Sequence, residues 1–336
     1  MATASTLTTL ESTKSPHFYF PDADLIIRTS DNITFHVHKT ILSFASRVFR
    51  DMLALDNINP PPTSEQRIVD VSEDGILTDA MLRYFYPLPR PIFSNLAPII
   101  ILLEIADKYD VPIIATSLED FLLTTTLGQA EPIRAYAVSK KFKLLRFEAY
   151  MEPVILKLPY SIFKGKDSPD ELSVITSDDI RKLDFYRSRR VARVTALLIE
   201  ELEDTPMCRC KKDQAAEFME DHADVSTEKD RASLEDGMTC LAWSTFTTYY
   251  IRHLKENPTL DISARYLRQE AIDKEFCKNA KKNLFGGYVE IIADFKREIE
   301  KIPWTFPDEW RAYESRKLEI NKAYRDNVKF EYAELK

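Results

Sequence analysis

The most informative pattern of apolar and polar positions lies between Asp22 and Leu53. Residues 25–27 form a short apolar run rich in β-branched side chains, which suit the pleated surface of a strand. Residues 30–32 read Ser-Asp-Asn, a sequence common in turns, and residues 33–37 then alternate between apolar and polar. Two such runs around a turn predict a β-hairpin.

From His38 onward the apolar period changes from two residues to three or four. This spacing places apolar side chains along one face of an α-helix. We therefore predict one amphipathic helix from Lys39 to Leu53, directly after the hairpin. The apolar positions that repeat are Ile41, Leu42, Ala45, Val48, Phe49, Met52 and Leu53.

The same stretch resembles the start of a BTB/POZ domain, in which an Asp precedes the first strand and a His-Lys pair opens the first helix. The matching positions are Asp24, Phe35, His38, Lys39, Leu42, Ser46, Phe49 and Met52. Residues 80–89 resemble the third helix of the family, and residues 102–122 resemble the two helices that close the domain. The proline-flanked end of the third helix and the helical remainder are similar to BTB proteins of basidiomycete fungi.

The resemblance implies an α+β BTB/POZ domain with a small sheet plus helices, followed by a mainly α-helical region. Apolar residues beyond residue 131 have helical spacing, whereas residues 203–237 carry mixed charges and few large apolar residues. We predict a disordered leader (1–16), a BTB/POZ domain (17–127), a helical region (128–202), a charged linker or insertion (203–237), a second helical region (238–302) and a charged tail (303–336).

Composition narrows the classes of function. The chain has 336 residues, a net charge of −8 and an isoelectric point near 5.4, which argues against general binding to a phosphate backbone. No apolar run approaches the roughly 20 residues that span a bilayer, and no secretory signal is evident. Four cysteines in 38.9 kDa indicate free thiols in a reducing compartment, so we expect an intracellular, cytoplasmic or nuclear, protein.

Few residue patterns indicate chemistry. The sequence has no glycine-rich phosphate loop, no nucleophile elbow and no paired histidines of a zinc protease, so we expect no catalytic residues, no cofactor and no enzyme. His36 and His38 lie two residues apart and could both bind a metal ion, but two ligands alone do not make a metal site. The basic run at 187–193 could indicate binding to nucleic acid, but such a run is more often a helix face that is exposed to solvent.

The four cysteines leave a zinc site open as an alternative. Their number matches a site that uses only cysteine ligands, although a Cys-x-Cys pair is shorter than the usual ligand spacing and the others lie far away. We favour free thiols, and keep a zinc-dependent structural or nucleic-acid-associated protein as an alternative. The residues concerned are Cys208, Cys210, Cys240 and Cys277.

The resemblance also implies a function. In BTB domains the residues matching Asp24 and Lys39 lie close together at the dimer surface, so we expect a partly buried charge pair there. We interpret the chain as a non-enzymatic protein-interaction and assembly module whose partner is a protein, including itself as a weak homodimer. An exchanged N-terminal strand is not expected, because residues 3–15 are short and polar.

A substrate adaptor of a cullin-type ubiquitin ligase is the alternative within the same class. Adaptors of this kind usually carry an apolar residue followed two positions later by Glu, just after the third helix. The matching neighbourhood here reads Leu88-Pro89-Arg90, with a cation in place of the acid. This departure counts against a cullin partner.

Overall fold

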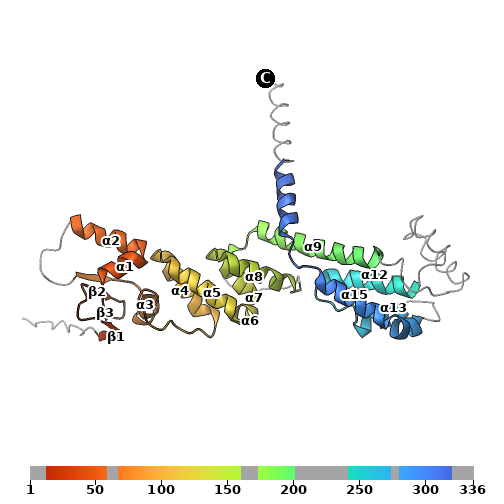
Figure 1. The fold of residues 1–336 in the computed structure, drawn as a ribbon, viewed down its shortest axis with the longest axis horizontal. Coiled ribbons are helices and arrows are strands. Elements are labelled where there is room, and N and C mark those ends of the chain that lie inside the picture. The colour runs from red at the N-terminus through yellow and green to blue at the C-terminus, as the bar shows by residue number, and fades with distance from the viewer. Residues whose placement is uncertain (1–12, 59–66, 160–172, 201–240, 274–279, 320–336) are drawn as a thin grey trace, which may run out of the picture. The chain divides into compact units, whose positions relative to one another are not determined.

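The predicted hairpin is confirmed and forms the middle of a four-stranded sheet (Figure 1). Strands β2 (Leu25–Arg28) and β3 (Ile33–Val37) run antiparallel, with Ile27 opposite Phe35. Strand β1 (Thr13–Tyr19) lies parallel to β3, and β4 (Arg67–Asp70) lies parallel to β2. The order across the sheet is therefore β1-β3-β2-β4.

The computed structural model describes residues 13–58, 67–159, 173–200, 241–273 and 280–319. The chain divides into two compact units, Met1–Met151 and Glu152–Lys336, which are described separately. The predicted leader ended at residue 16, but strand β1 already begins at Thr13, because its residues pair with the backbone of β3. An N-terminal strand therefore completes the sheet within the same chain.

Helices pack with the sheet to complete the first unit. Its core includes Phe18 and Phe35 from the sheet and Leu42 and Phe49 from the helices that follow it. The helices are α1 (Lys39–Ala45), α2 (Arg47–Ile58), α3 (Gly75–Leu82), α4 (Leu96–Lys108), α5 (Pro112–Thr124), α6 (Leu127–Ala130), α7 (Pro132–Lys141) and α8 (Leu145–Leu156), the last of which crosses into the second unit.

The turn of the hairpin is fixed to the start of α3. Asn32 adopts a left-handed conformation with φ of 62°, as residues in tight turns often do. The Asp31 carboxylate accepts a hydrogen bond from the backbone N–H of Gly75 at 3.0 Å. A Cβ atom at Gly75 would lie 2.5 Å from Cδ1 of Ile33, so a larger residue here would have to displace the end of the Ile33 side chain.

The second unit is helical in its described part. A buried cluster that includes Trp243, Phe246 and Phe295 forms its core. No helix in the described ranges is both long and apolar enough to cross a membrane. The elements are α9 (Ser177–Glu200), α12 (Leu241–Glu256), α13 (Arg265–Asp273), α14 (Ala280–Lys282), the π-helical turn η4 (Asn283–Gly287), α15 (Val289–Lys301) and a helix at 307–319.

Helix α9 begins at Ser177, and Thr176 and Asp179 cap its start reciprocally. The Thr176 backbone N–H donates to Asp179 at 2.9 Å, and the Asp179 N–H donates back to the Thr176 hydroxyl at 3.2 Å. This pattern is a capping box, with an aspartate in the position that Glu or Gln usually occupies.

Glu73 ties the turn after β4 to the end of α4. Its carboxylate accepts hydrogen bonds from the Lys108 ammonium and from the Tyr109 hydroxyl, each at 2.6 Å. Burial raises the pKa of Glu73, but the two hydrogen bonds outweigh burial and hold the pKa below its ordinary value of 4.5. The charged form of Glu73 therefore stabilises the first unit.

We expect that Glu73→Gln reduces the loss of folding stability that the protein undergoes as the pH falls. Because the folded-state pKa of Glu73 is depressed, its contribution is present above the ordinary pKa and is lost as the pH falls through the folded-state pKa. Thermal melts between neutral pH and about pH 3.5 should show a smaller loss for the variant than for the parent. The exposed Glu104 gives a control, since Glu104→Gln should keep the parent's dependence. Equal slopes for Glu73→Gln and the parent would contradict the prediction.

Candidate interaction surface

Half of the residues of the sequence motif are buried and help to build the first unit. Phe35, Leu42, Ser46 and Phe49 are buried, and Met52 is half-buried. Phe49 stacks on the ring of Tyr109, with centroids 5.0 Å apart. These positions hold the helices on the sheet and are not available to a partner.

Ser46 breaks the helix that the apolar spacing predicted from Lys39 to Leu53, so the single-helix prediction is wrong. Its backbone is extended, with φ of −132° and ψ of 127°, and separates α1 from α2. The Ser46 hydroxyl donates to the carbonyl of Tyr109 at 2.5 Å and accepts from the N–H of Phe49 at 3.0 Å. Ser46 thus caps α2 and fastens it to the end of α4.

The backbone and the ring of His38 both make contacts within the first unit. The hydroxyl of Tyr86 accepts a hydrogen bond from the His38 backbone N–H at 2.9 Å. The same hydroxyl lies 3.1 Å from Nδ1 of the His38 ring. The Nε2 atom lies 3.3 Å from a carboxylate oxygen of Asp22, and the hydrogen bond from His38 lowers the pKa of Asp22. His36 instead packs edge-on to the ring of Tyr19. No group of three potential metal ligands occurs among the residues that the structure describes.

Asp24 and Lys39 do not form the charge pair that we expected. The Asp24 carboxylate accepts a hydrogen bond from the backbone N–H of Lys39 at 2.8 Å. Asp24 is exposed and Lys39 is half-buried, so the pair is not a buried charge cluster. The first N–H groups of a helix lack partners within the helix, and a nearby carboxylate satisfies one of them here. Asp24 therefore stabilises the start of α1.

The exposed apolar side chains of α1 and α2 define a different surface. Phe44 in α1 is 88% exposed, and Val48 and Leu55 in α2 are 40% and 63% exposed. Val48 and Leu55 are seven residues apart, two helical turns, so they lie on the same side of α2. Exposure of large apolar groups on neighbouring elements is a feature of protein-binding surfaces. Phe44, Val48 and Leu55 are called the α1–α2 face below.

Charged side chains of both signs accompany the α1–α2 face. Asp51 lies between Val48 and Leu55 in the helical sequence and is exposed. Arg47 and Arg50 each approach its carboxylate at 3.8 Å. Such exposed pairs contribute little to folding stability, so these groups remain available to exchange partners.

The segment after α3 is the place where a cullin adaptor would carry its glutamate. Arg90 here lies over the ring of Tyr84, at 5.3 Å from its centroid, and Arg83 donates to the carbonyl of Pro89 at 3.0 Å. Ile92 is 93% exposed. The segment therefore presents a cation and an isolated isoleucine.

The basic run at 187–193 is only in part the solvated face that we predicted, because Arg189 and Arg193 are exposed but Arg190 is buried. Arg187 donates to the carbonyl of Leu158 at 2.8 Å, and Arg190 donates to that of Ile299 at 3.1 Å. Arg189 and Arg193 both bind the carboxylate of Glu309. These arginines join α9 to other parts of the second unit. The acceptors lie so far away in the sequence that no local pattern indicates them.

The predicted cysteine positions cannot be placed. Cys208, Cys210, Cys240 and Cys277 lie outside the described residues, so the zinc alternative remains a prediction.

Comparison with known families agrees with this architecture. Residues 19–126 match the family model of the BTB/POZ domain. The chain therefore carries a BTB/POZ domain, a protein–protein interaction module and not a family of enzymes. A search of curated proteins gives no match. The expected similarity to proteins of basidiomycete fungi has no support from any homologue.

Proposed function

We propose that this chain is a non-enzymatic assembly protein whose BTB/POZ domain binds a second copy through the α1–α2 face. The observation that carries the proposal is the exposure of Phe44, Val48 and Leu55 on two consecutive helices of an interaction domain. Burying such side chains in a dimer removes apolar area from water, at about 25 cal/mol per Å² before the costs of association.

The charges around the face favour a second copy as the occupant. A two-fold axis brings the same helix of two copies together, so a contact of residue i of one copy with residue j of the other is repeated in reverse. Asp51 of one copy then has Arg47 and Arg50 of the other as available partners, and the reverse holds by symmetry. A surface that carries both signs on one helix is therefore complementary to itself.

Replacement of Phe44 tests the proposal. Phe44→Asp places a carboxylate where two apolar faces meet, so we expect the dissociation constant of the dimer to rise at least about tenfold. Analytical ultracentrifugation over a concentration series measures this constant. Phe44 is almost fully exposed, so the monomer should keep its circular dichroism spectrum and melting temperature.

Ile92→Asp provides the matched control. Ile92 lies in the same unit and is even more exposed than Phe44, but it lies outside the α1–α2 face. The control should therefore self-associate like the parent. A parent chain that stays monomeric at tens of micromolar, or an equal effect of both variants, would rule out the proposed dimer and leave the face for another protein.

The alternatives predicted from the sequence remain separate questions. A cullin that co-purifies with the chain would favour the adaptor. Zinc measured in the purified protein, and lost with the cysteines, would favour the third alternative. We also propose a reducing intracellular compartment for the protein, a proposal supported by the four cysteines in the sequence.

A further inference from the structure

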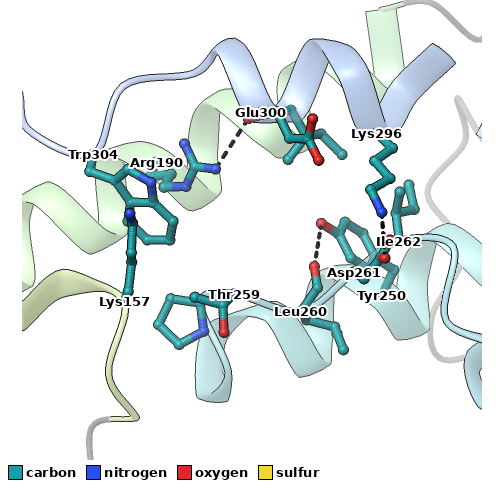
Figure 2. Close-up of a pocket in the computed structure, with 12 residues that line it drawn as sticks. Lys157, Arg190, Tyr250, Thr259, Leu260, Asp261, Ile262, Lys296, Glu300 and Trp304 are labelled. Atoms are coloured by element: carbon teal, nitrogen blue, oxygen red, sulfur yellow. Dashed lines mark hydrogen bonds and ion pairs between the residues drawn. The ribbon is translucent and has the colours of Figure 1, made fainter. Parts of the chain in front are cut away.

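A hollow of about 280 Å³ lies within the second unit, apart from the BTB/POZ domain (Figure 2). Arg190 of α9, Tyr250 of α12 and Lys296 of α15 contribute to its walls. The turn that follows α12 supplies a mainly apolar side through Leu260 and Ile262. The other residues around the hollow are Lys157, Pro258, Thr259, Asp261, Ile299, Glu300 and Trp304.

The wall of the hollow holds a buried cation. Arg190 is only 7% exposed, and its guanidinium carbon lies 4.0 Å from the centroid of the Trp304 ring. Its Nη2 atom donates to the carbonyl of Ile299 at 3.1 Å, and its Nη1 atom donates to that of Ile302. These carbonyls lie at the end of α15, where the helix dipole is negative and partly compensates the charge.

Arg190 has no carboxylate partner among the residues that the structure describes. Its Nε atom is also buried and has no hydrogen-bond acceptor in that part of the chain. Burial lowers the pKa of Arg190, which reflects the cost of holding its charge away from water. Backbone carbonyls carry only partial charges, so a full negative charge nearby would be favourable.

The remaining charged groups leave the hollow with an excess of one positive charge. Lys296 and Asp261 bind each other at 2.6 Å and cancel. Lys157 is exposed at the edge, with its ammonium 5.7 Å from the Trp304 centroid, and it makes no ion pair in the described ranges. Glu300 is exposed and brings the opposing negative charge. Lys157 and Arg190 therefore outnumber Glu300.

We propose that this hollow binds a small organic anion, namely a carboxylate attached to an apolar, preferably planar body. The carboxylate would lie near Lys157 and Arg190, and the body would pack on Trp304 and the turn at Leu260. The ligand needs both the carboxylate and the apolar body, because the hollow combines one excess cation with aromatic and aliphatic walls. This inference does not depend on self-association of the BTB/POZ domain.

Benzoate, benzyl alcohol and benzylamine test the charge preference on the full chain. The three compounds share a ring and differ in charge, and saturation-transfer NMR measures their binding. For a ligand of this size we expect benzoate to bind with a dissociation constant of about 10 mM or lower. The other two compounds should bind at least about fivefold more weakly. Equal binding of the three compounds, or no saturation by benzoate, would overturn the proposal.

Two substitutions locate the binding. Lys157→Glu reverses the charge at the edge of the hollow and should weaken benzoate binding about tenfold or more, whereas Lys255→Glu should leave it unchanged. Both lysines are exposed, so both variants should fold. Glu300→Gln should tighten binding, because it removes the opposing carboxylate. Benzoate binding that Lys157→Glu leaves intact would place the compound elsewhere and reject the hollow as its site.

Discussion

Phe49→Ala should lower the free energy of unfolding of the first unit by about 3–5 kcal/mol. Phe49 is 1% exposed and stacks against Tyr109 with the two rings nearly parallel, at an angle of 2°. Removal of the ring takes away buried apolar area and leaves a cavity between α2 and the end of α4. The neighbouring Ser46 holds the same two elements together, so the site cannot collapse freely to fill the space.

Hydrogen exchange followed by mass spectrometry measures this loss in each unit separately. Peptides from β2 and β3 should exchange faster in Phe49→Ala, while those from α12 and α15 should exchange as in the parent. Phe44→Ala is the matched control, because the same residue type is removed from an exposed position five residues earlier. Equal destabilisation by the two substitutions would show that the placement of Phe49 in the core is wrong.

The hairpin and most helices of the BTB/POZ domain could be predicted because their signals are local. Apolar residues at a period of two indicated β2 and β3, and a period of three to four indicated the helical segment after them. The break at Ser46 could not be predicted in this way. Its hydroxyl binds the carbonyl of Tyr109, which lies 63 residues later, and only the folded chain brings the two together.

The exposed surface was harder to predict than the core. Val48 and Phe49 are adjacent apolar residues and fit the same helical pattern, yet one is exposed and the other is buried. The break at Ser46 separates α1 from α2. A single helical wheel drawn over the whole segment therefore assigns some residues to the wrong side, buried or exposed. Phe44 is not one of the repeating apolar positions, and it is the most exposed residue of the face in the structure.

The contacts of the arginines in α9 could not be predicted from the sequence either. Its sequence favours either a nucleic-acid contact or a solvated face, because both need only clustered cations. The acceptor of Arg190 at Ile299 lies 109 residues away, and Glu309 lies more than a hundred residues from Arg189 and Arg193. Composition cannot indicate such partners, and so the hollow beside Arg190 had no signal in the sequence.

Trp243→Ala should have an effect of similar size in the second unit, again about 3–5 kcal/mol. Trp243 is 2% exposed, and its ring centroid lies 5.6 Å from those of Phe246, Tyr288 and Phe295. The residue therefore joins α12 to α15 and to Tyr288, which precedes α15. Its loss should accelerate exchange in α12 and α15 and leave the BTB/POZ strands unchanged.

Trp243→Phe separates the contribution of the ring from that of the indole N–H. The Nε1 atom is buried and has no hydrogen-bond partner among the described residues, so its removal relieves a cost of about 1–3 kcal/mol. This gain offsets part of the packing lost with the smaller ring, and we expect a net loss below about 2 kcal/mol. Tyr266→Ala in α13 is the exposed aromatic control and should change stability little. A loss for Trp243→Phe as large as that for Trp243→Ala would mean that the indole N–H stabilises the fold through a partner outside the described residues.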